Sequence, residues 1–395
     1  MPVRKDTIIR GIPVGMRKPV DVYVRDGVVQ RMGAPGQTSP DFGSEEAHIG
    51  PPLFDIQVNG VAGIELQGSA VKPEDYLRVT EYLARWGVMY WAPTLVTAPA
   101  EEMEYGCRVF AEAMRDRRVA RAVPGLHLEG PHISAEDGPR GAHPKTHVRN
   151  PSVRELNRMR KAAEDQILYV TVAPEMPGAG RFIKAAAAHG VLVALGHHNA
   201  NAEQIEKAAD AGARLCTHLG NGAASMIHRH HNPIWPQLAE DRLHASFIAD
   251  LHHLPEPVLK ACVRAKGFDK TVLTSDCIAL AGLKPGKYVF AGSDVELRRD
   301  GKVCLLGTDL LAGSAHMLLQ GVVNAWRATD LTLEGAFACG SSVPGKLLGV
   351  RMPPPLRKGR RMNGIVFEVD WMKRRGKPQV SAVFFRGEQV FPAPA

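Results

Sequence analysis

The amino-acid sequence predicts an α/β fold, a (β/α)8 TIM-like barrel with a small β-sandwich domain formed from both termini. Eight short apolar segments alternate with helical patterns through the middle of the chain, which is the layout of such a barrel. Further strand-like segments occupy both ends. The 395 residues suffice for the roughly 250 residues of a barrel and for a smaller second domain.

The barrel is expected to occupy residues 51–349. Its strands are predicted where apolar and β-branched residues cluster, and the stretches between them are rich in Ala, Glu, Arg and Lys, as in residues 73–86 and 202–211. Such alternation predicts strands followed by helices. The eight predicted strands are residues 53–58, 88–95, 123–128, 167–172, 191–195, 213–216, 244–249 and 271–274.

The small domain is expected to combine residues 1–50 with residues 350–395. Near the N-terminus, residues 20–24 and 27–32 have strand character and precede a loop rich in Gly, Pro and Ser. Residues 364–369 and 380–385 have the same character. Two β-rich ends around a long middle indicate that the termini pair into one sheet domain.

The composition is that of a soluble globular protein, with 45% hydrophobic and 23% charged residues. No apolar run approaches the roughly 18 residues of a membrane span, and the N-terminus lacks the apolar core of a secretory signal. The six cysteines are scattered, without the close pairs of a zinc knuckle or redox motif. We therefore expect reduced thiols, a cytoplasmic location and no membrane contact.

The formal net charge of +8 is concentrated near the C-terminus. Nine lysines and arginines, including Lys373, Arg374 and Arg375, lie between residues 351 and 377, against two acidic residues. Basic clusters can bind nucleic acid, but this one is interrupted by a strand-like segment and lacks interleaved aromatic residues. We expect a solvated basic face and no nucleic-acid partner.

Polar side chains follow five of the predicted strands, at the barrel end where active sites of this fold lie. They are Glu129, His197 with His198, His218, Asp250 with His252 and His253, and Asp276. Two neutral imidazoles and one carboxylate form a catalytic zinc set that leaves the fourth position to water. A carboxylate at a buried strand end, such as Glu129, is then explained as the ligand of a cation, and Asp276 as the general base that faces the water.

Six motifs resemble those of the N-acetylglucosamine-6-phosphate deacetylase family of the amidohydrolase superfamily. They follow the order of the family over about residues 50–345, with Gly141-Ala142-His143 between the second and the third. The motifs are PPLFDIQVNG (51–60), GLHLEGPHIS (125–134), LGHHNA (195–200), THLGNG (217–222), LTSDCIALAG (273–282) and LLAGSAHML (310–318). The flanking β segments fit the small β-sandwich domain of the family.

The resemblance implies that Glu129, His197 and His218 are metal ligands and that Asp276 is the catalytic acid/base. The resemblance also implies that these ligands bind one divalent metal ion. The types of ligand favour zinc, with iron, cobalt and manganese as alternatives.

Two departures from the superfamily pattern favour a single ion. Many members carry His-x-His at the end of strand one and a lysine on strand four, and these bind a second ion. This chain has Gln57 and Asn59 at the first place and no lysine in the strand-four segment.

The resemblance also assigns residues to the substrate, a small-molecule amino-sugar phosphate. Backbone amides, an arginine and a histidine would hold the phosphate, and the family places that histidine across the interface of a homodimer. The phosphate residues are Asn221, Gly222, Arg229 and His253. The residues for the sugar and its N-acetyl group are Ala142, His143, Leu311, Ala312 and Gly313.

The loop around Arg229 departs from the family, because Arg229 lies in His-Arg-His-His where Gly-Arg-Glu-Pro is usual. This loop is either a plain polar loop or a reshaped anion site in which His230 or His231 adds donors. His132 and His198 also replace other residue types, and we expect them beside the metal ligands rather than on the ion.

These features predict metal-dependent hydrolysis of the N-acetyl amide of N-acetylglucosamine 6-phosphate, giving glucosamine 6-phosphate and acetate. One alternative is an amidohydrolase acting on a different N-acyl or cyclic amide substrate, because the metal set is shared and the substrate loop diverges. The other is a non-catalytic barrel that binds partners through its basic C-terminal segment.

Overall fold

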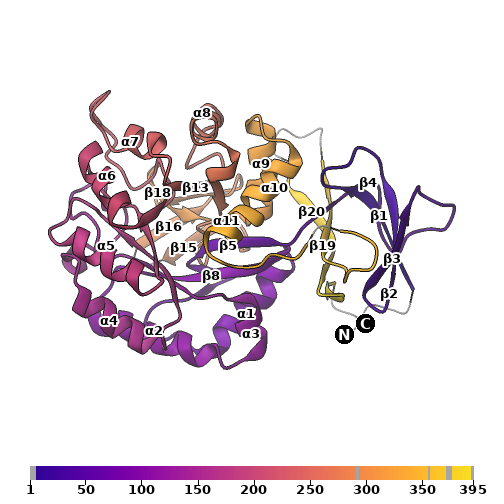
Figure 1. Cartoon of the computed structure of the whole chain (residues 1–395), viewed down its shortest axis with the longest axis horizontal. Helices are drawn as coiled ribbons and strands as arrows, with labels where there is room; N and C mark the ends of the chain where they lie inside the picture. Colours follow the sequence, from indigo (N-terminus) through magenta and orange to yellow (C-terminus); the bar gives the residue numbers. More distant parts are fainter. Residues whose placement is uncertain (1–5, 291–292, 355, 371–375, 393–395) are drawn as a thin grey trace.

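The computed structural model describes residues 6–290, 293–354, 356–370 and 376–392. An eight-stranded parallel barrel lies beside a sheet made from both ends of the chain (Figure 1). Within the described ranges, no helix has the length and apolar character needed to cross a membrane. Lys373, Arg374 and Arg375 of the basic segment lie outside the described residues.

The predicted (β/α)8 barrel is confirmed. Its strands are β5 (Leu53–Val58), β8 (Val88–Val96), β9 (Leu126–Glu129), β10 (Ile167–Val172), β11 (Leu192–Leu195), β12 (Ala213–Cys216), β13 (His244–Ile248) and β14 (Thr271–Thr274). Neighbouring strands pair in this order. The ring closes just beyond the first and last strands, where the Asn59 N–H donates to the Cys277 carbonyl at 2.8 Å.

The bounds of the barrel strands agree with the predicted ones to within one residue except at β9. This strand begins at Leu126, three residues later than predicted, because Pro124 has no N–H for a ladder hydrogen bond. The Leu126 N–H makes the first such bond, to the Gln166 carbonyl at 2.9 Å.

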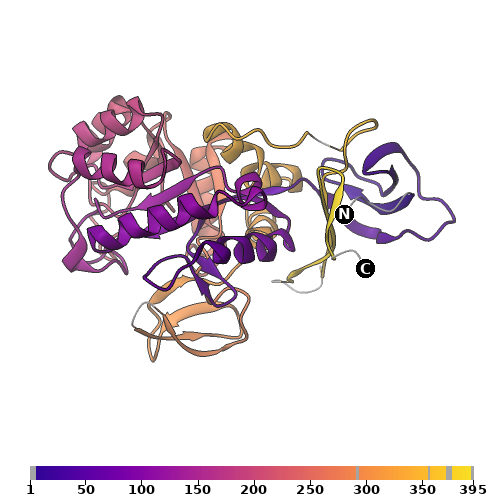
Figure 2. The same ribbon diagram turned by 90° about the horizontal axis from the view of Figure 1, so that it is seen from below.

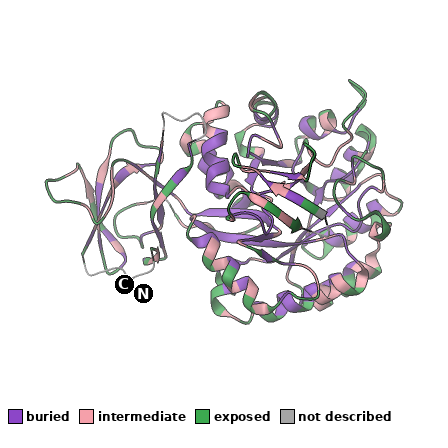
Figure 3. Ribbon diagram, turned by 180° about the vertical axis from the view of Figure 1, so that it is seen from behind, coloured by how far each residue is buried: buried purple, intermediate pink, exposed green. Residues whose placement is uncertain are grey.

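Helices surround the barrel and bury one face each against it (Figure 3). Among them, α6 begins at a capping box in which Asn201 and Gln204 exchange hydrogen bonds, and it ends before Gly212. The helices are α1 (Pro73–Ala84), α2 (Ala100–Ala113), α3 (Arg117–Ala122), α4 (Val153–Ala162), α5 (Ala179–Ala188), α6 (Ala202–Ala211), α7 (Ile234–Ala239), α8 (Glu256–Lys266), α9 (Leu318–Ala328), α10 (Leu333–Cys339) and α11 (Ser342–Leu347), with 3-10 turns η1 (Lys145–His147) and η2 (Phe268–Lys270).

The β-rich domain predicted from both termini is present as a seven-stranded sheet. Antiparallel pairing of β4 with β19 joins its two parts, and the sheet encloses a core of its own that includes Ile9, Val22, Val366 and Phe384. The strands are β1 (Thr7–Pro13), β2 (Val20–Arg25), β3 (Val28–Gly33), β4 (Phe42–Gly50), β19 (Gly364–Val369), β20 (Pro378–Phe385) and β21 (Glu388–Phe391). The domain limits at residues 50 and 350 stay a prediction.

A four-stranded antiparallel sheet after β14 was not predicted. It projects from one end of the barrel (Figure 2) and consists of β15 (Gly286–Phe290), β16 (Ser293–Leu297), β17 (Lys302–Leu305) and β18 (Leu311–Ser314). The Ile278 N–H donates to the Ser314 carbonyl at 3.0 Å, which fastens β18 to the segment that follows β14. The short hairpin of β6 (Gly60–Val61) and β7 (Ile64–Glu65) contacts the same segment, through the Gly63 N–H and the Ala279 carbonyl at 2.7 Å.

Candidate active site

Three side chains predicted as metal ligands meet at the C-terminal end of the barrel. Glu129 is the last residue of β9, and His197 and His218 each lie two residues beyond the end of a strand. Glu129 Oε1 is 3.2 Å from His197 Nε2 and 2.8 Å from His218 Nε2. The two Nε2 atoms are 3.1 Å apart. All three residues are buried, so these polar atoms face one another in a space closed to most water.

The backbone turns inward at these positions. His197, His218 and Asp276 have φ values of 53°, 29° and 49°, in the left-handed region that non-glycine residues rarely adopt. Each such residue costs about 1–3 kcal/mol and persists where the surrounding structure fixes it. The common strain therefore marks the turns after β11, β12 and β14 as parts of one site.

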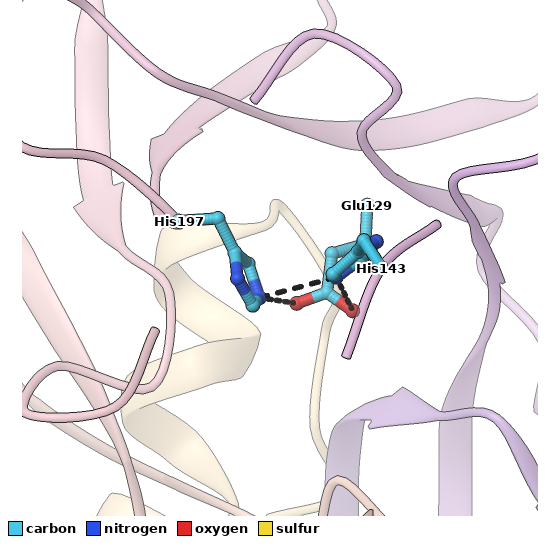
Figure 4. Close-up of side chains that lie close together, drawn as sticks. All are labelled: Glu129, His143 and His197. Carbon is cyan, nitrogen blue, oxygen red and sulfur yellow. Dashed lines mark hydrogen bonds and ion pairs between the residues drawn. The ribbon is translucent and has the colours of Figure 1, made fainter. Parts of the chain in front are cut away.

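His143 also lies at this cluster, from the loop that follows β9 (Figure 4). Its Nε2 is 3.3 Å from His197 Nε2 and 4.0 Å from Glu129 Oε2. Glu129, His143 and His197 form a group whose donor atoms all lie within 4.8 Å of one another. The sequence assigned His143 to the sugar, whereas the structure brings it to the edge of the ligand cluster.

The hydrogen bonds of Nδ1 distinguish His143 from His197. His143 Nδ1 lies 2.9 Å from the Thr97 hydroxyl and 3.4 Å from the Thr97 backbone N–H, and a ring that accepts from this N–H carries its proton on Nε2. His197 Nδ1 instead lies 3.0 Å from the Pro139 carbonyl and donates to it, which leaves the Nε2 lone pair free to bind a cation. Burial lowers the pKa of His143 to about 3, so this ring is neutral.

Polar side chains of β5 and the residue after it hold the two carboxylates. Gln57 Nε2 donates to Glu129 Oε1 at 2.9 Å, and Asn59 Nδ2 donates to Asp276 Oδ1 at 2.7 Å. Deeper in the barrel, Asp55 Oδ1 accepts from the Ser275 N–H at 3.0 Å. Gln57 and Asn59 were noted in the sequence for the ligands they replace, and their donor role was missed. The sequence did contain a signal for this role, because polar residues recur at every second position along the buried strand β5 and just beyond it. These residues are Asp55, Gln57 and Asn59.

Electrostatics separate the two carboxylates. Asp276 keeps some surface open to the mouth of the barrel, yet burial and the charge of Glu129 raise its pKa to about 7. Burial also acts to raise the pKa of Glu129, but hydrogen bonds with His197 and His218 outweigh it and lower that pKa well below the usual range. Glu129 is thus a fixed anion, and Asp276 can take up and release a proton near neutral pH.

Several predicted substrate residues line the same mouth. The Gly222 backbone lies so close to the His197 ring that a Cβ added at Gly222 would be 2.8 Å from His197 Nδ1. Asn221 donates through Nδ2 to the His218 carbonyl at 3.3 Å. His253 Nδ1 is 2.7 Å from Asp250 Oδ2, and its charge acts on the pKa of Asp276.

The sugar residues other than His143 fall on two segments. Ala142, which precedes His143, is exposed. Leu311, Ala312 and Gly313 belong to β18, and an added Cβ at Gly313 would lie 2.7 Å from the Ile278 side chain. This strand therefore packs directly beside the turn that carries Asp276.

Arg229 is not brought to the cluster. It lies in an exposed loop, and its guanidinium makes no hydrogen bond or ion pair among the described residues. The loop is held from within, because the N–H groups of His230 and His231 donate to His228 Nδ1 at 3.2 and 2.9 Å. Met226 and Trp235 beside it are 88% and 53% exposed.

His132 and His198 are both buried, and neither contacts a predicted ligand side chain in the described part of the chain. His132 Nδ1 lies 3.3 Å from the Arg149 carbonyl. His198 Nδ1 accepts from the Ala200 N–H at 3.2 Å. Both rings therefore stabilise the loops around the site.

Known proteins resemble this chain over most of its length. The sequence is 30% identical to the N-acetylglucosamine-6-phosphate deacetylase of Vibrio furnissii, over 76% of this chain and 74% of that protein. It is also 30% identical to the N-acetylgalactosamine-6-phosphate deacetylase of Escherichia coli O157:H7, over 80% and 83%. The chain belongs to the N-acetylglucosamine-6-phosphate deacetylase family. The motif-based family prediction and the enzyme class, a hydrolase of the deacetylase type, are thereby confirmed.

Solved structures of this family have the same fold. A mutant of the Mycobacterium smegmatis N-acetyl-D-glucosamine-6-phosphate deacetylase, in complex with N-acetyl-D-glucosamine-6-phosphate, superposes with a TM-score of 0.81 at 25% identity. The match covers 98% of this chain and 99% of that one. No family model matches the sequence. Family membership favours an enzyme over a non-catalytic barrel.

Proposed function

We propose that the protein hydrolyses the N-acetyl amide of N-acetylglucosamine 6-phosphate to glucosamine 6-phosphate and acetate. One observation carries the proposal: Glu129, His197 and His218 converge from three separate strands beside a carboxylate, Asp276, whose pKa is raised to about 7. Two relatives at 30% identity are named for the removal of acetyl groups from amino-sugar phosphates. That chemistry fits a site built around a cation and a proton carrier.

The three ligand side chains fit one divalent metal ion. Ligand bonds of about 2.0–2.2 Å in a tetrahedral site put donor atoms about 3.3–3.6 Å apart. The three donor atoms here are 2.8, 3.1 and 3.2 Å apart, so a small outward movement of the side chains would admit the ion. Two imidazole Nε2 atoms this close in a buried site require a cation or a proton between them. We assign zinc by ligand type, with iron, cobalt and manganese as alternatives.

The rest of the cluster supports one ion and an open position. His143 has its proton on Nε2 and is therefore a donor toward the substrate rather than a third imidazole ligand. The amides of Gln57 and Asn59 donate to the carboxylates at the place where a second ion would need ligands. Three protein ligands leave the fourth position of a tetrahedral site to water.

When bound, a divalent cation lowers the pKa of water toward about 7 and polarises an amide carbonyl. Asp276 takes the proton of the attacking water while the water oxygen bonds to the acetyl carbon. His143 donates from Nε2 to the carbonyl oxygen as negative charge develops there. Asp276 then gives the same proton to the amide nitrogen, the C–N bond breaks, and acetate and the free amine leave.

Recognition of the phosphate is proposed for Asn221, Gly222, Arg229 and His253. The backbone at Asn221 and Gly222 lies directly beside the ligand cluster, whereas Arg229 is exposed and would have to reach the phosphate from the rim. Exposed Met226 and Trp235 next to Arg229 support a homodimer in which this loop meets a second copy. Six buried free cysteines support a cytoplasmic setting.

Hydrolysis of four compounds tests the proposal with the metal-replete enzyme, followed as acetate release for the three acetylated sugars and as ring opening for the cyclic amide. The compounds are N-acetylglucosamine 6-phosphate, N-acetylgalactosamine 6-phosphate, unphosphorylated N-acetylglucosamine and a cyclic amide such as dihydroorotate. We expect the first to have the highest kcat/KM, at least about tenfold above its unphosphorylated form, because charge-assisted contacts hold the phosphate. Faster turnover of the cyclic amide would establish the alternative substrate class, and no acetate from either phosphosugar would contradict the proposal.

A further inference from the structure

A cavity lies at the opposite end of the barrel from the candidate active site. It is half open to solvent and is bordered by α1, α3, the beginning of β8 and the hairpin of β20 and β21, and its volume is about 770 Å³. This volume is within the range of small-molecule sites, about 300–1,000 Å³. Met89, near the N-terminal end of β8, belongs to its wall, whereas the catalytic cluster lies at the C-terminal ends of the strands.

The cavity is strongly basic. Five arginines and two glutamates line it, which gives a net charge of +3. Arg118 is compensated, because it pairs with Asp116 at 2.7 Å and with Glu81 at 3.6 Å. The remaining arginines have no carboxylate partner in the described part of the chain. They are Arg85, Arg121, Arg361 and Arg386.

Arg386 has a backbone conformation that its residue type does not favour. With Gly387 it forms the two-residue turn between β20 and β21, and both have positive φ, 54° and 84°. Such turns favour Asn-Gly or Asp-Gly. The adjacent turn between β2 and β3 follows that rule with Asp26-Gly27, at φ 50° and 74°. A strained arginine at the corresponding place points to a role for its guanidinium.

The surrounding contacts fix Arg386 in place. Its backbone N–H donates to Asn363 Oδ1 at 2.7 Å, and its Nη2 donates to the Tyr90 hydroxyl at 3.4 Å. Arg361 Nη1 donates to the Arg386 carbonyl at 3.1 Å, which holds the two arginines together. Two guanidinium groups are thus preorganised on the hairpin side of the cavity, with Arg121 from α3 on the barrel side.

One wall of the cavity is apolar. Phe385 packs edge-on against Tyr90 with ring centroids 5.7 Å apart, and Met89, Val390 and Phe391 continue the surface. Guanidinium groups bind phosphate through paired hydrogen bonds, and an aromatic and aliphatic wall accepts a planar or apolar group.

We propose that this cavity binds a small organic phosphate whose remaining part is planar or apolar, with a nucleoside diphosphate as the representative probe. The site is separate from the catalytic mouth and binds its ligand together with the deacetylase substrate. The proposal does not rest on the function assigned to the catalytic site.

Isothermal titration calorimetry of the full-length metal-bound enzyme tests the site with ADP, pyrophosphate, glucose 6-phosphate and adenosine. The cavity variants described below separate binding in the cavity from binding at the catalytic mouth. We expect one ADP per chain, weaker binding of pyrophosphate and of glucose 6-phosphate, and no binding of adenosine. ADP affinity should fall as salt rises, because the charges are exposed.

Two variants and a control connect binding to the cavity. Arg386→Asn suits the turn and removes the guanidinium, and Arg121→Gln acts from the other wall. Each should weaken ADP at least about tenfold with deacetylase activity unchanged. Arg181→Gln, on an exposed face of α5, should leave ADP affinity unchanged.

Three results would overturn the proposal. The first is the absence of saturable ADP binding, and the second is ADP binding that both cavity variants leave intact. The third is pyrophosphate or glucose 6-phosphate binding as tightly as ADP, which would remove the apolar wall from recognition.

Discussion

The two sides of the barrel mouth are held in different ways. On the ligand side, which comprises Glu129, His197, His218 and Asp276, the side chains have partners at 2.7–3.2 Å on the barrel strands and the turns after them. On the anion loop, residues 226–235, the hydrogen bonds run within the loop, and Arg229 is exposed.

We interpret this difference as a division of roles, in which the ligand side carries out the proposed chemistry and the anion loop selects the substrate. Rigid strand ends fix the reacting groups within a short range, as an efficient active site requires. A loop on the surface can change its residues without disturbing those groups. Variants on the ligand side should therefore change kcat, and variants in the anion loop should change KM.

Replacing the proton carrier should have the largest effect. Asp276→Asn keeps the size and the contact with Asn59 but removes the base, so kcat should fall by about 10²–10⁴-fold with the metal retained. Steady-state kinetics with elemental analysis of the same sample measures both. Turnover close to that of the wild type would remove Asp276 from its acid/base role.

Loss of a single supporting hydrogen bond should have the next largest effect. Asn59→Leu removes the donor at 2.7 Å from Asp276 Oδ1, and bonds to charged groups contribute about 1.5–3 kcal/mol. We expect kcat to fall about tenfold to hundredfold with little change in KM. Because Asn59 lowers the pKa of Asp276, the acid limb of the rate profile should move to higher pH. If the acid limb of the rate profile did not move in Asn59→Leu, Asn59 would have only a structural role.

Variants in the anion loop should change the KM for the phosphorylated substrate. Arg229→Gln should raise KM for the phosphorylated substrate about tenfold or more, since one charge-assisted contact is lost, and leave the unphosphorylated sugar unaffected. His231→Gln is the matched test of a reshaped anion site and should give a smaller rise in KM if its ring contacts phosphate. Equal losses on both substrates in Arg229→Gln would place Arg229 in the fold rather than in recognition.

The smallest of the expected effects is the change in kcat/KM of the wild-type enzyme near neutral pH. Asp276 must be ionised to accept a proton, so kcat/KM should fall as pH falls through its pKa and be flat above it. Burial raises this pKa to about 7, and a bound cation lowers it, so the midpoint should lie at or below about 7. A profile that rises toward lower pH would contradict a carboxylate base.

Local patterns sufficed to predict the barrel and the three side chains that meet at its mouth. The bounds of β10, β12 and β14 agree with the sequence because each strand is a short apolar run with a clear end. Glu129, His197 and His218 could be found because the ends of parallel strands meet at one face.

Features that depend on distant register could not be predicted. Asn59 reaches Asp276 across 217 residues of sequence, and the place of His143 depends on a loop without regular structure. The sheet of β15 to β18 was missed because charged residues such as Lys287, Asp294 and Glu296 interrupt its strands, which therefore form no clear apolar run. The strained backbone at His197 and Asp276 has no residue signal, since neither is a glycine.

Metal content of two histidine variants tests the central claim most directly. The purified wild type should carry one divalent ion per chain. His143→Gln should keep that ion, because the Nε2 of this ring bears a proton, whereas His218→Gln should lose it together with activity. Retention of the ion by His218→Gln and its loss from His143→Gln would contradict the ligand set and the roles built on it.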